Sequence, residues 1–315
     1  MTQNDKDLNK QELNISQNNS EQSIQETEIE NSEIDCENDA IDEDETKEEI
    51  EEASGKKDKK AAIVVKDLRK IYRLGSEKVV ALNTINLKIM QGEICCIVGT
   101  SGSGKSTLLN QLAGLEKPTK GAVYIYNKNV SKMSENTLAK LRQKYIGFIF
   151  QSYNLLPMLT ALENVGMPLM FKGVSKYIRN QKAKKMLKAV GLGKRYKHKP
   201  TQMSGGQQQR VGIARAFVAN PKIVFADEPT GNLDTKTTME VMELMVKMCK
   251  EFNQTLIIVT HDKELSLFAD RVVTLIDGNI VSDIVNENVV TTAKEAMAIM
   301  EEEMKASIKK AVNAG

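Results

Sequence analysis

The chain has 315 residues, and its apolar content of 41% is enough for one large hydrophobic core or two modest ones. It contains no apolar run near the roughly 18 residues that cross a bilayer, and its four cysteines lack metal-ligand or disulfide spacing, which excludes membrane-spanning and disulfide-rich secreted classes. The net charge of +2 conceals a split, because residues 1–54 carry 19 acidic residues and 3 lysines, whereas the remainder carries 41 basic and 23 acidic residues.

Residues 1–60, the first segment in chain order, show nothing that predicts a folded core. They have no aromatic residue and no apolar periodicity, and Glu, Asp, Asn, Gln and Ser dominate them. Such a composition buries too little surface to offset the entropy of ordering. We expect a disordered acidic tail, which either contacts the basic body at low salt or only aids solubility. Because the N-terminus lacks the apolar part of a secretion signal, we expect a cytoplasmic protein.

Residues 61–285 alternate short β-branched runs with helical segments, which is the pattern of a three-layer α/β domain. A helix is expected over about residues 105–115. Helical spacing dominates between about residues 152 and 203, with helices over 162–171 and 176–190, so we expect an inserted helical subdomain. Strands are expected at 61–65, 92–98, 122–126, 146–150, 223–226, 256–260 and 272–276.

The last segment, residues 286–315, is expected to be an amphipathic helix. Its apolar residues recur at steps of three or four, and this face can pack on its own domain or against a partner. A row of methionines spaced by three is interpreted as core packing. The first set is Val289, Ala293, Met297, Met300, Met304, Ile308 and Val312, and the second is Met239, Met242, Met245 and Met248.

A glycine-rich loop carries the most specific chemistry in the sequence. Residues 99–106 read Gly-Thr-Ser-Gly-Ser-Gly-Lys-Ser, which matches the phosphate-binding loop pattern in full and lies between a predicted strand and a predicted helix. The glycines let backbone N–H groups and the helix N-terminus face phosphates. Lys105 is expected to reach the β- and γ-phosphates, and the Ser106 hydroxyl to bind Mg²⁺.

A second element is the apolar strand at 223–226, which leads into two adjacent carboxylates, Asp227 and Glu228. Side-chain alternation along a strand predicts that the two carboxylates point in different directions, so they cannot share one role. Asp227 is placed to hold Mg²⁺, and Glu228 is the candidate general base for an attacking water.

A third element is the Ser204-Gly205-Gly206-Gln207 turn that opens a helix. We call these four residues the signature turn. A serine-capped helix N-terminus is an anion site, although alone it could be a simple cap. It stands far along the chain from the phosphate-binding loop, so we infer that it serves a different nucleotide.

Together, the loop, the signature turn, the Asp-Glu strand end and a later histidine resemble the ATP-binding-cassette (ABC) ATPases in order and spacing, over about residues 62–284. The resemblance implies an α/β P-loop NTPase core with an antiparallel β subdomain and an inserted α-helical subdomain. It also implies a homodimer, in which the signature serine and glycines of one subunit close on the γ-phosphate held by the other. On this basis Ser204 and Gly206 act in trans.

The resemblance assigns further roles residue by residue. Tyr72 matches the aromatic that stacks on adenine, and Gln151 matches the glutamine that touches Mg²⁺ and the attacking water. Asp234 matches the loop that links the two sites across the dimer, and His261 matches the switch histidine that contacts the γ-phosphate. The expected catalytic residues are Lys105, Gln151, Glu228 and His261, the Mg²⁺ ligands are Ser106, Gln151 and Asp227, and the ATP contacts are Tyr72, Gly99, Ser101, Gly102, Ser103, Gly104, Lys105, Ser106, Thr107, Ser204, Gly205, Gly206, Gln207 and Asp234.

Three stretches, residues 153–157, 159–165 and 227–234, are similar to the lipoprotein-releasing and macrolide-exporting branch of the family. This similarity implies a separate membrane permease, whose cytoplasmic coupling helix docks on residues 151–176 at the inner face of the cell membrane. The candidate socket residues, about half of which could instead be core, are Tyr153, Leu155, Leu156, Met158 and Phe171.

Two alternatives to a transport motor remain open. A signalling ATPase that pulls on a membrane partner in cell division or cell-wall control would use the same ATPase surface. A nucleic-acid cassette protein would suit the basic body, but the chain has no long coiled-coil insertion and no second cassette, so no nucleic-acid partner is expected.

Overall fold

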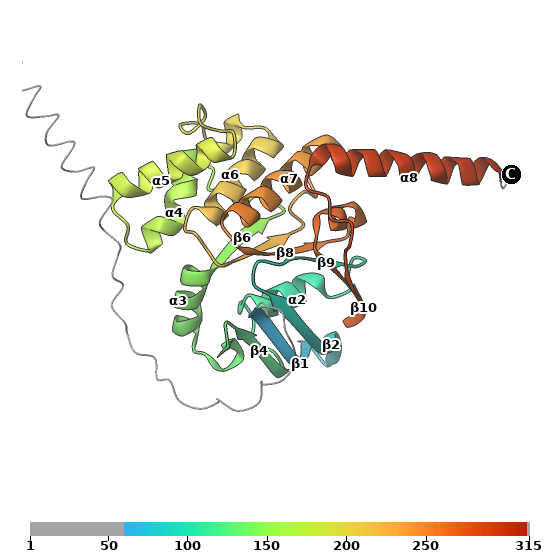
Figure 1. Cartoon of the computed structure of the whole chain (residues 1–315). Coiled ribbons are helices and arrows are strands. Elements are labelled where there is room, and N and C mark those ends of the chain that lie inside the picture. The colour runs from blue at the N-terminus through green and yellow to red at the C-terminus, as the bar shows by residue number, and fades with distance from the viewer. Residues whose placement is uncertain (1–59, 314–315) are drawn as a thin grey trace, which may run out of the picture. The chain divides into compact units, whose positions relative to one another are not determined.

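A twisted six-stranded sheet forms the centre of the structure, which is a computed structural model that describes residues 60–313 (Figure 1). Its strands lie in the order β10-β9-β3-β8-β7-β6, and all neighbours are parallel except β9 and β10. Every residue of β3 and β8 is buried, as expected of a parallel sheet covered on both faces. The strands are β3 (Ile94–Val98), β6 (Ile146–Phe150), β7 (Ile223–Asp227), β8 (Thr255–Thr260), β9 (Arg271–Ile276) and β10 (Asn279–Val285).

A smaller antiparallel sheet, ordered β2-β1-β4-β5, provides the second β layer. The predicted strand at 61–65 is the start of a long hairpin, whose register shifts several times where bulges interrupt the pairing. β2 was absent from the prediction because its first half is exposed and lacks a clear apolar alternation. The strands are β1 (Ala61–Leu74), β2 (Glu77–Met90), β4 (Lys120–Ile125) and β5 (Lys128–Asn129).

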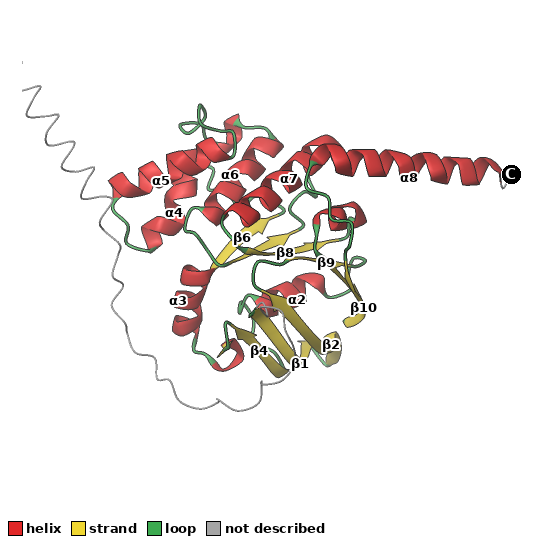
Figure 2. Ribbon diagram, viewed as in Figure 1, coloured by secondary structure: helices red, strands yellow, loops and turns green. Residues whose placement is uncertain are grey.

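Helices cover the six-stranded sheet, and α4 and α5 form the predicted helical insert beside α6 (Figure 2). Side-chain caps fix several helix starts, which are Ser134 for α3, Thr160 for α4, Ser204 for α6 and Asp234 for α7. The helices are α2 (Lys105–Leu112), α3 (Glu135–Tyr145), α4 (Ala161–Phe171), α5 (Lys176–Ala189), α6 (Gly205–Phe217), α7 (Thr235–Glu251) and α8 (Ala293–Asn313), with short 3₁₀ turns η1 (Val130–Lys132), η2 (Pro200–Gln202) and η3 (Lys263–Phe268).

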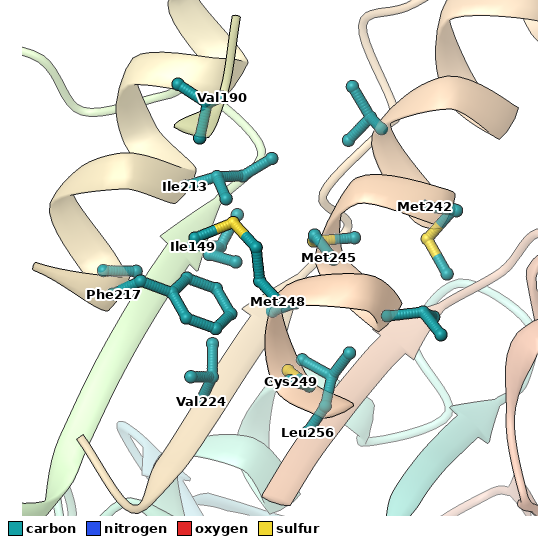
Figure 3. Close-up of a cluster of buried hydrophobic side chains, with 14 of the residues drawn as sticks. Ile149, Val190, Ile213, Phe217, Val224, Met242, Met245, Met248, Cys249 and Leu256 are labelled. Carbon is teal, nitrogen blue, oxygen red and sulfur yellow. The ribbon is translucent and has the colours of Figure 1, made fainter. Parts of the chain in front are cut away.

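Two hydrophobic clusters hold these layers together. One joins α6, α7 and the helical insert to the main sheet, and the other joins α2 and the antiparallel sheet to its opposite face. The predicted methionine row on α7 belongs to the first cluster, where all four residues are at most 3% exposed, and Figure 3 labels Met242, Met245 and Met248. Cys95, Cys96 and Cys249 are buried as well, and burial raises the pKa of the Cys96 thiol to about 12.

α8 confirms the predicted C-terminal helix, although it begins at Ala293 instead of Val289. Its first turns pack on the body, since Ala296 is fully buried and Met297 and Met300 are partly buried against the first cluster. Further along, Met304 is 63% exposed, and the helix continues past the body in Figure 1. Packing on its own domain is therefore confirmed for the first turns. Among the described residues, no helix is long and apolar enough to cross a membrane.

Candidate active site

Four parallel strands, β3, β6, β7 and β8, end at one edge of the main sheet, and the candidate residues lie there. Gly99 follows β3, Gln151 follows β6, Asp227 closes β7 and His261 follows β8. The carboxyl edge of a parallel sheet is the usual place for a ligand, because loops and helix N-termini meet there. The main-sheet fold therefore gathers residues from four distant parts of the chain.

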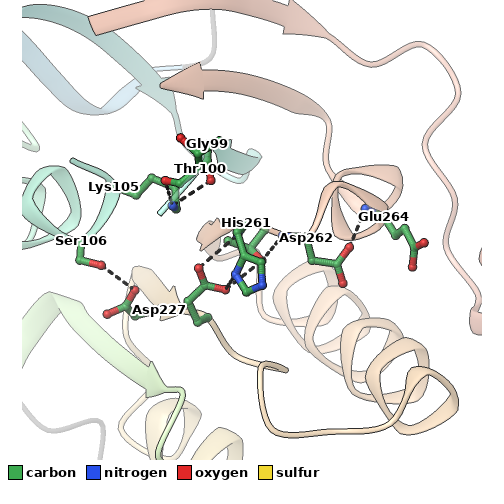
Figure 4. Close-up of polar contacts among 10 residues, drawn as sticks. Gly99, Thr100, Lys105, Ser106, Asp227, His261, Asp262 and Glu264 are labelled. Carbon is green, nitrogen blue, oxygen red and sulfur yellow. Dashed lines mark hydrogen bonds and ion pairs between the residues drawn. The ribbon is translucent and has the colours of Figure 1, made fainter. Parts of the chain in front are cut away.

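The phosphate-binding loop leaves the N-terminus of α2 without a side-chain cap. Gly104, the N-cap residue, has φ +100°, and a Cβ there would lie 2.5 Å from the Ala81 carbonyl oxygen. The N–H groups of the first turn are thus unobstructed by any capping side chain. The Lys105 ammonium, only 7% exposed as a residue, donates to the carbonyl oxygens of Gly99 (2.9 Å) and Thr100 (2.8 Å), as Figure 4 shows. A buried cation beside free N–H donors forms a binding site for a polyanion.

The Ser106 hydroxyl and the Asp227 carboxylate face each other at 3.4 Å (Figure 4). Burial, followed by the charge of Glu228, raises the pKa of Asp227 above its ordinary value. A hydroxyl and a carboxylate are hard oxygen donors of the kind that Mg²⁺ prefers. A divalent ion between them would offset the electrostatic repulsion between the Asp227 and Glu228 carboxylates. The donor set therefore fits Mg²⁺.

Glu228 is turned away from Asp227 and toward the end of β8. Its carboxylate accepts from Thr260 Oγ1 (3.1 Å) and from the His261 backbone N–H (3.1 Å), and lies 2.9 Å from His261 Nδ1. The two carboxylates diverge as predicted, but strand alternation is not the reason. β7 ends at Asp227, and Glu228 has φ +44°, so a left-handed backbone turn separates them.

A cleft of about 1140 Å³ joins these groups to the antiparallel sheet. Its lining includes the contacting pair Glu228 and His261, Tyr72 of β1, and nearly the whole loop. Of the predicted loop contacts, Ser103 is the exception, since it is 1% exposed, is absent from the lining, and its hydroxyl has no hydrogen-bond partner among the described residues. The predicted contacts that line the cleft are Tyr72, Gly99, Ser101, Gly102, Gly104, Lys105, Ser106 and Thr107.

Gln151 and Asp234 are not among the described residues that line this cleft. The Gln151 amide rests against Gly231, where an added Cβ would lie 2.7 Å from its Nε2, and the Gln151 carbonyl accepts from Asn232. Asp234 caps α7 by accepting from the Thr237 N–H (3.0 Å) and hydroxyl (2.7 Å). Among the described residues, neither side chain forms a hydrogen bond with the Ser106–Asp227 pair.

The signature turn is separate from the cleft lining of its own chain. Ser204 Oγ accepts from the Gln207 N–H at 3.4 Å, and Gln207 Oε1 accepts from the Ser204 N–H at 3.3 Å. This capping box opens α6 at an exposed surface. Among the described residues that line the cleft, none belongs to the signature turn. An anion bound at this turn would therefore not be one held in the cleft of the same chain.

Two residues of this region carry no sequence pattern and were missed. Lys70 and Glu116 surround Tyr72 at the edge of the cleft, where Glu116 accepts from the tyrosine hydroxyl at 2.7 Å. Tyr72 and Glu116 are 44 residues apart in the sequence. The only available signal was the aromatic itself, because a lone carboxylate after a helix is an ordinary surface residue.

Comparisons with known proteins agree with this geometry. The family described as ABC transporter matches residues 82–231. An uncharacterised ABC transporter ATP-binding protein of Methanocaldococcus jannaschii is 53% identical over 225 residues, which are 71% of this chain and 100% of that protein. The lipoprotein-releasing system ATP-binding protein LolD of Geobacter metallireducens is 47% identical, covering 70% of this chain and 97% of LolD.

A macrolide export ATP-binding/permease protein, MacB of Vibrio parahaemolyticus serotype O3:K6, is 45% identical, and the match covers 74% of this chain but 35% of MacB. Among solved structures, the dimeric post-hydrolysis state of the ATP-binding cassette MJ0796 bound to ADP and Pi has a TM-score of 0.67 at 44% identity. That match covers 71% of this chain and 98% of the cassette.

Proposed function

The chain belongs to the ABC transporter ATP-binding proteins, and from this premise we propose the role of each residue in its site. It is an ATP-binding and ATP-hydrolysing subunit that acts as a dimer with a membrane permease as partner. The observation that supports the assignment best is the uncapped N-terminus of α2, with Lys105 buried beside it and the Ser106–Asp227 pair next to it. These groups suit a triphosphate and its metal ion.

In the proposed reaction, Lys105 and the loop N–H groups bind the phosphates, and Glu228 accepts a proton from the attacking water. Its carboxylate is held by Thr260 and His261, so it is oriented before the water arrives. His261, whose side chain is 64% exposed, can leave Glu228 to contact the γ-phosphate. Gln151 would need to move from Gly231 to touch the metal or the water.

Mg²⁺ is proposed to be held by Ser106 and Asp227, with Gln151 as a further ligand. When bound, it would neutralise phosphate charge during the transfer. The protein's own contribution is to keep the Asp227 carboxylate close to the Ser106 hydroxyl at the end of β7, and to point Glu228 elsewhere.

The second half of each site is proposed to come from the other subunit, through Ser204, Gly205, Gly206 and Gln207. This proposal rests on the position of the signature turn outside the cleft of its own chain and on the dimeric state of the MJ0796 cassette. Asp234, at the start of α7, would link the two sites. Closure of the dimer on ATP and its reopening after hydrolysis would supply the mechanical work.

The permease is proposed to dock beside α4 at the inner face of the membrane. Leu156, Met158 and Phe171 are 48%, 82% and 66% exposed, so they are available to an apolar partner helix. Tyr153 and Leu155 are half-buried, and Leu155 packs on the first cluster. Export, including release of lipoproteins or peptides, is preferred over signalling because the named relatives LolD and MacB are release and export proteins.

The proposed function is tested by Glu228→Gln, which keeps the size of the side chain and removes the base. We expect ATP hydrolysis to fall by at least about 100-fold, with ATP binding retained. Because turnover is blocked, the variant should form a stable dimer with ATP and Mg²⁺, measured by size-exclusion chromatography with light scattering. The wild-type chain and an ADP sample serve as controls. A folded variant that stays monomeric in ATP and Mg²⁺ would contradict the composite-site mechanism.

A further inference from the structure

Three side chains, Tyr72, Lys70 and Glu116, meet at the edge of the cleft that Tyr72 lines. We propose that Glu116, with Lys70, positions the ring of Tyr72 and so sets the affinity of the site for adenine. The inference rests on the proposed role of Tyr72 as the adenine contact. It adds two residues that hold this aromatic in place.

Both partners contact a single oxygen of Glu116. Oε2 accepts from the Tyr72 hydroxyl at 2.7 Å and from the Lys70 ammonium at 3.1 Å, while Asn110 donates to Oε1 at 3.4 Å. The Lys70 ammonium also lies over the Tyr72 ring, 5.1 Å from its centroid. One ring face is thus occupied by a cation and the hydroxyl is fixed, which leaves the other face for a planar ligand.

The loop that carries Glu116 connects α2 to β4, and hydrogen bonds tie it to α2 and to β1. Toward α2, the Leu115 N–H donates to the Asn110 carbonyl at 2.9 Å. Toward β1, the Thr119 N–H donates to the Arg69 carbonyl (2.9 Å), and the Thr119 hydroxyl accepts from the Ile71 N–H (3.0 Å). Glu116 therefore holds Tyr72 in a fixed relation to α2, the helix whose N-terminus faces the phosphates.

The electrostatics keep this set intact at neutral pH. Although burial raises the pKa of Glu116, the hydrogen bonds from Tyr72 and Lys70 outweigh it and lower the pKa below the usual range. Burial, followed by the hydrogen bond to Glu116, raises the pKa of the Tyr72 hydroxyl. Glu116 therefore stays a carboxylate that accepts, and Tyr72 stays a phenol that donates. A tyrosine held this way loses little rotational entropy when adenine stacks on it.

The test compares ATP with inorganic tripolyphosphate, which carries the phosphates without the base. We expect Glu116→Ala to weaken ATP binding about fivefold and to raise the KM for ATP similarly, with kcat unchanged within about twofold. Binding of tripolyphosphate should be unaltered. Glu116→Gln, whose amide oxygen still accepts from the hydroxyl, should lose less. The control is Glu135→Ala, which removes an exposed ion pair with Arg142 on α3, outside the cleft lining.

A double-mutant cycle decides whether Glu116 acts through the ring. If it does, Tyr72→Ala with Glu116→Ala should bind ATP no more weakly than Tyr72→Ala alone. Equal loss of ATP and tripolyphosphate affinity, or full additivity in the cycle, would overturn the inference. If Tyr72→Ala weakens ATP while Glu116→Ala does not, only this inference fails. If Tyr72→Ala itself leaves ATP affinity unchanged, the adenine assignment in the proposed function fails as well.

Discussion

The N-termini of α2 and α6 both follow polar, glycine-containing turns, but only one of them is capped. At α2 the preceding residue is Gly104, which has no side chain to offer, and Lys105 stands beside the open turn. At α6, Ser204 and Gln207 satisfy each other across the first turn. The first helix end therefore needs a ligand, whereas the second is complete without one.

This difference fits the proposed mechanism, in which one copy binds ATP and two copies are needed for hydrolysis. The phosphate site at α2 has no capping side chain that an anion would have to displace. The two hydrogen bonds at α6 are long, at 3.4 and 3.3 Å, so a phosphate delivered by a second subunit can replace them at little cost. The three predictions that follow test this contrast, from the largest expected effect to the smallest.

Lys105→Ala should abolish the site at α2. The ammonium is the only cation in the cleft lining that is held against the loop carbonyls, so we expect ATP affinity to fall by about 100-fold or more and hydrolysis to be lost. Isothermal titration calorimetry measures the affinity, and the control is Lys182→Ala at an exposed position of α5. Retention of tight ATP binding would mean that the helix N-terminus alone carries the phosphates.

Ser204→Arg should spare ATP binding by the isolated chain but lower hydrolysis by at least about 100-fold, because the bulky cation blocks the turn that the second subunit needs. Mixing this variant with Lys105→Ala sharpens the contrast. Half of the resulting dimers pair an intact loop with an intact signature turn, so activity should return to roughly a quarter of wild type. If the mixture stays inactive while heterodimers form, the signature turn does not act in trans.

The capping box of α6 should be insensitive to acid, unlike the matching box of α4, where Thr160 pairs with Glu163. Hydrogen bonds from the Thr160 side chain and backbone lower the pKa of Glu163. The Glu163 carboxylate therefore contributes its full stabilisation above the pKa that it has in the unfolded chain. This contribution is lost as the pH falls through the lower pKa that Glu163 has in the folded protein.

Glu163→Gln should lower the free energy of unfolding by less than about 1 kcal/mol near neutral pH and by a smaller amount near about pH 3. Gln207→Ala should cost a similar amount at both pH values, since Gln207 does not titrate. Urea unfolding at the two pH values gives both numbers. A pH-dependent cost for Gln207→Ala would contradict the assignment of its box.

Local sequence patterns predicted the parts of the site that each lie within one stretch of chain. Three buried strands are recognisable from the local sequence alone, without knowledge of which strands pair with them. One is followed by the glycine-rich loop, one ends at Asp227 and one is followed by His261. The parallel order of the strands then brings these ends together. For this reason Lys105, Ser106 and Glu228 lie near one edge of the main sheet, and their roles stay predictions.

Contacts between distant residues, and strands at sheet edges, were not predictable in this way. Glu116 meets Tyr72 only because the loop before β4 folds back on β1. β10 lies at an edge of the main sheet, and its exposed Val281, Ile284 and Val285 blur the alternation of a half-buried strand. The direction of Glu228 depends on a backbone turn with positive φ that no side-chain pattern revealed.

The buried thiols of β3 and α7 can be used to measure how often the packed layers around them separate. Cys95, Cys96 and Cys249 are at most 1% exposed, and burial raises the pKa of each thiol, so alkylating reagents reach them only when the surrounding layers separate. With Cys36 replaced by serine, the labelling rate of the remaining cysteines counts openings of the sheet that carries the nucleotide loop. Bound ATP should slow that rate, because a ligand that binds only the folded state stabilises it. The decrease in labelling rate therefore measures how much ATP stabilises the fold.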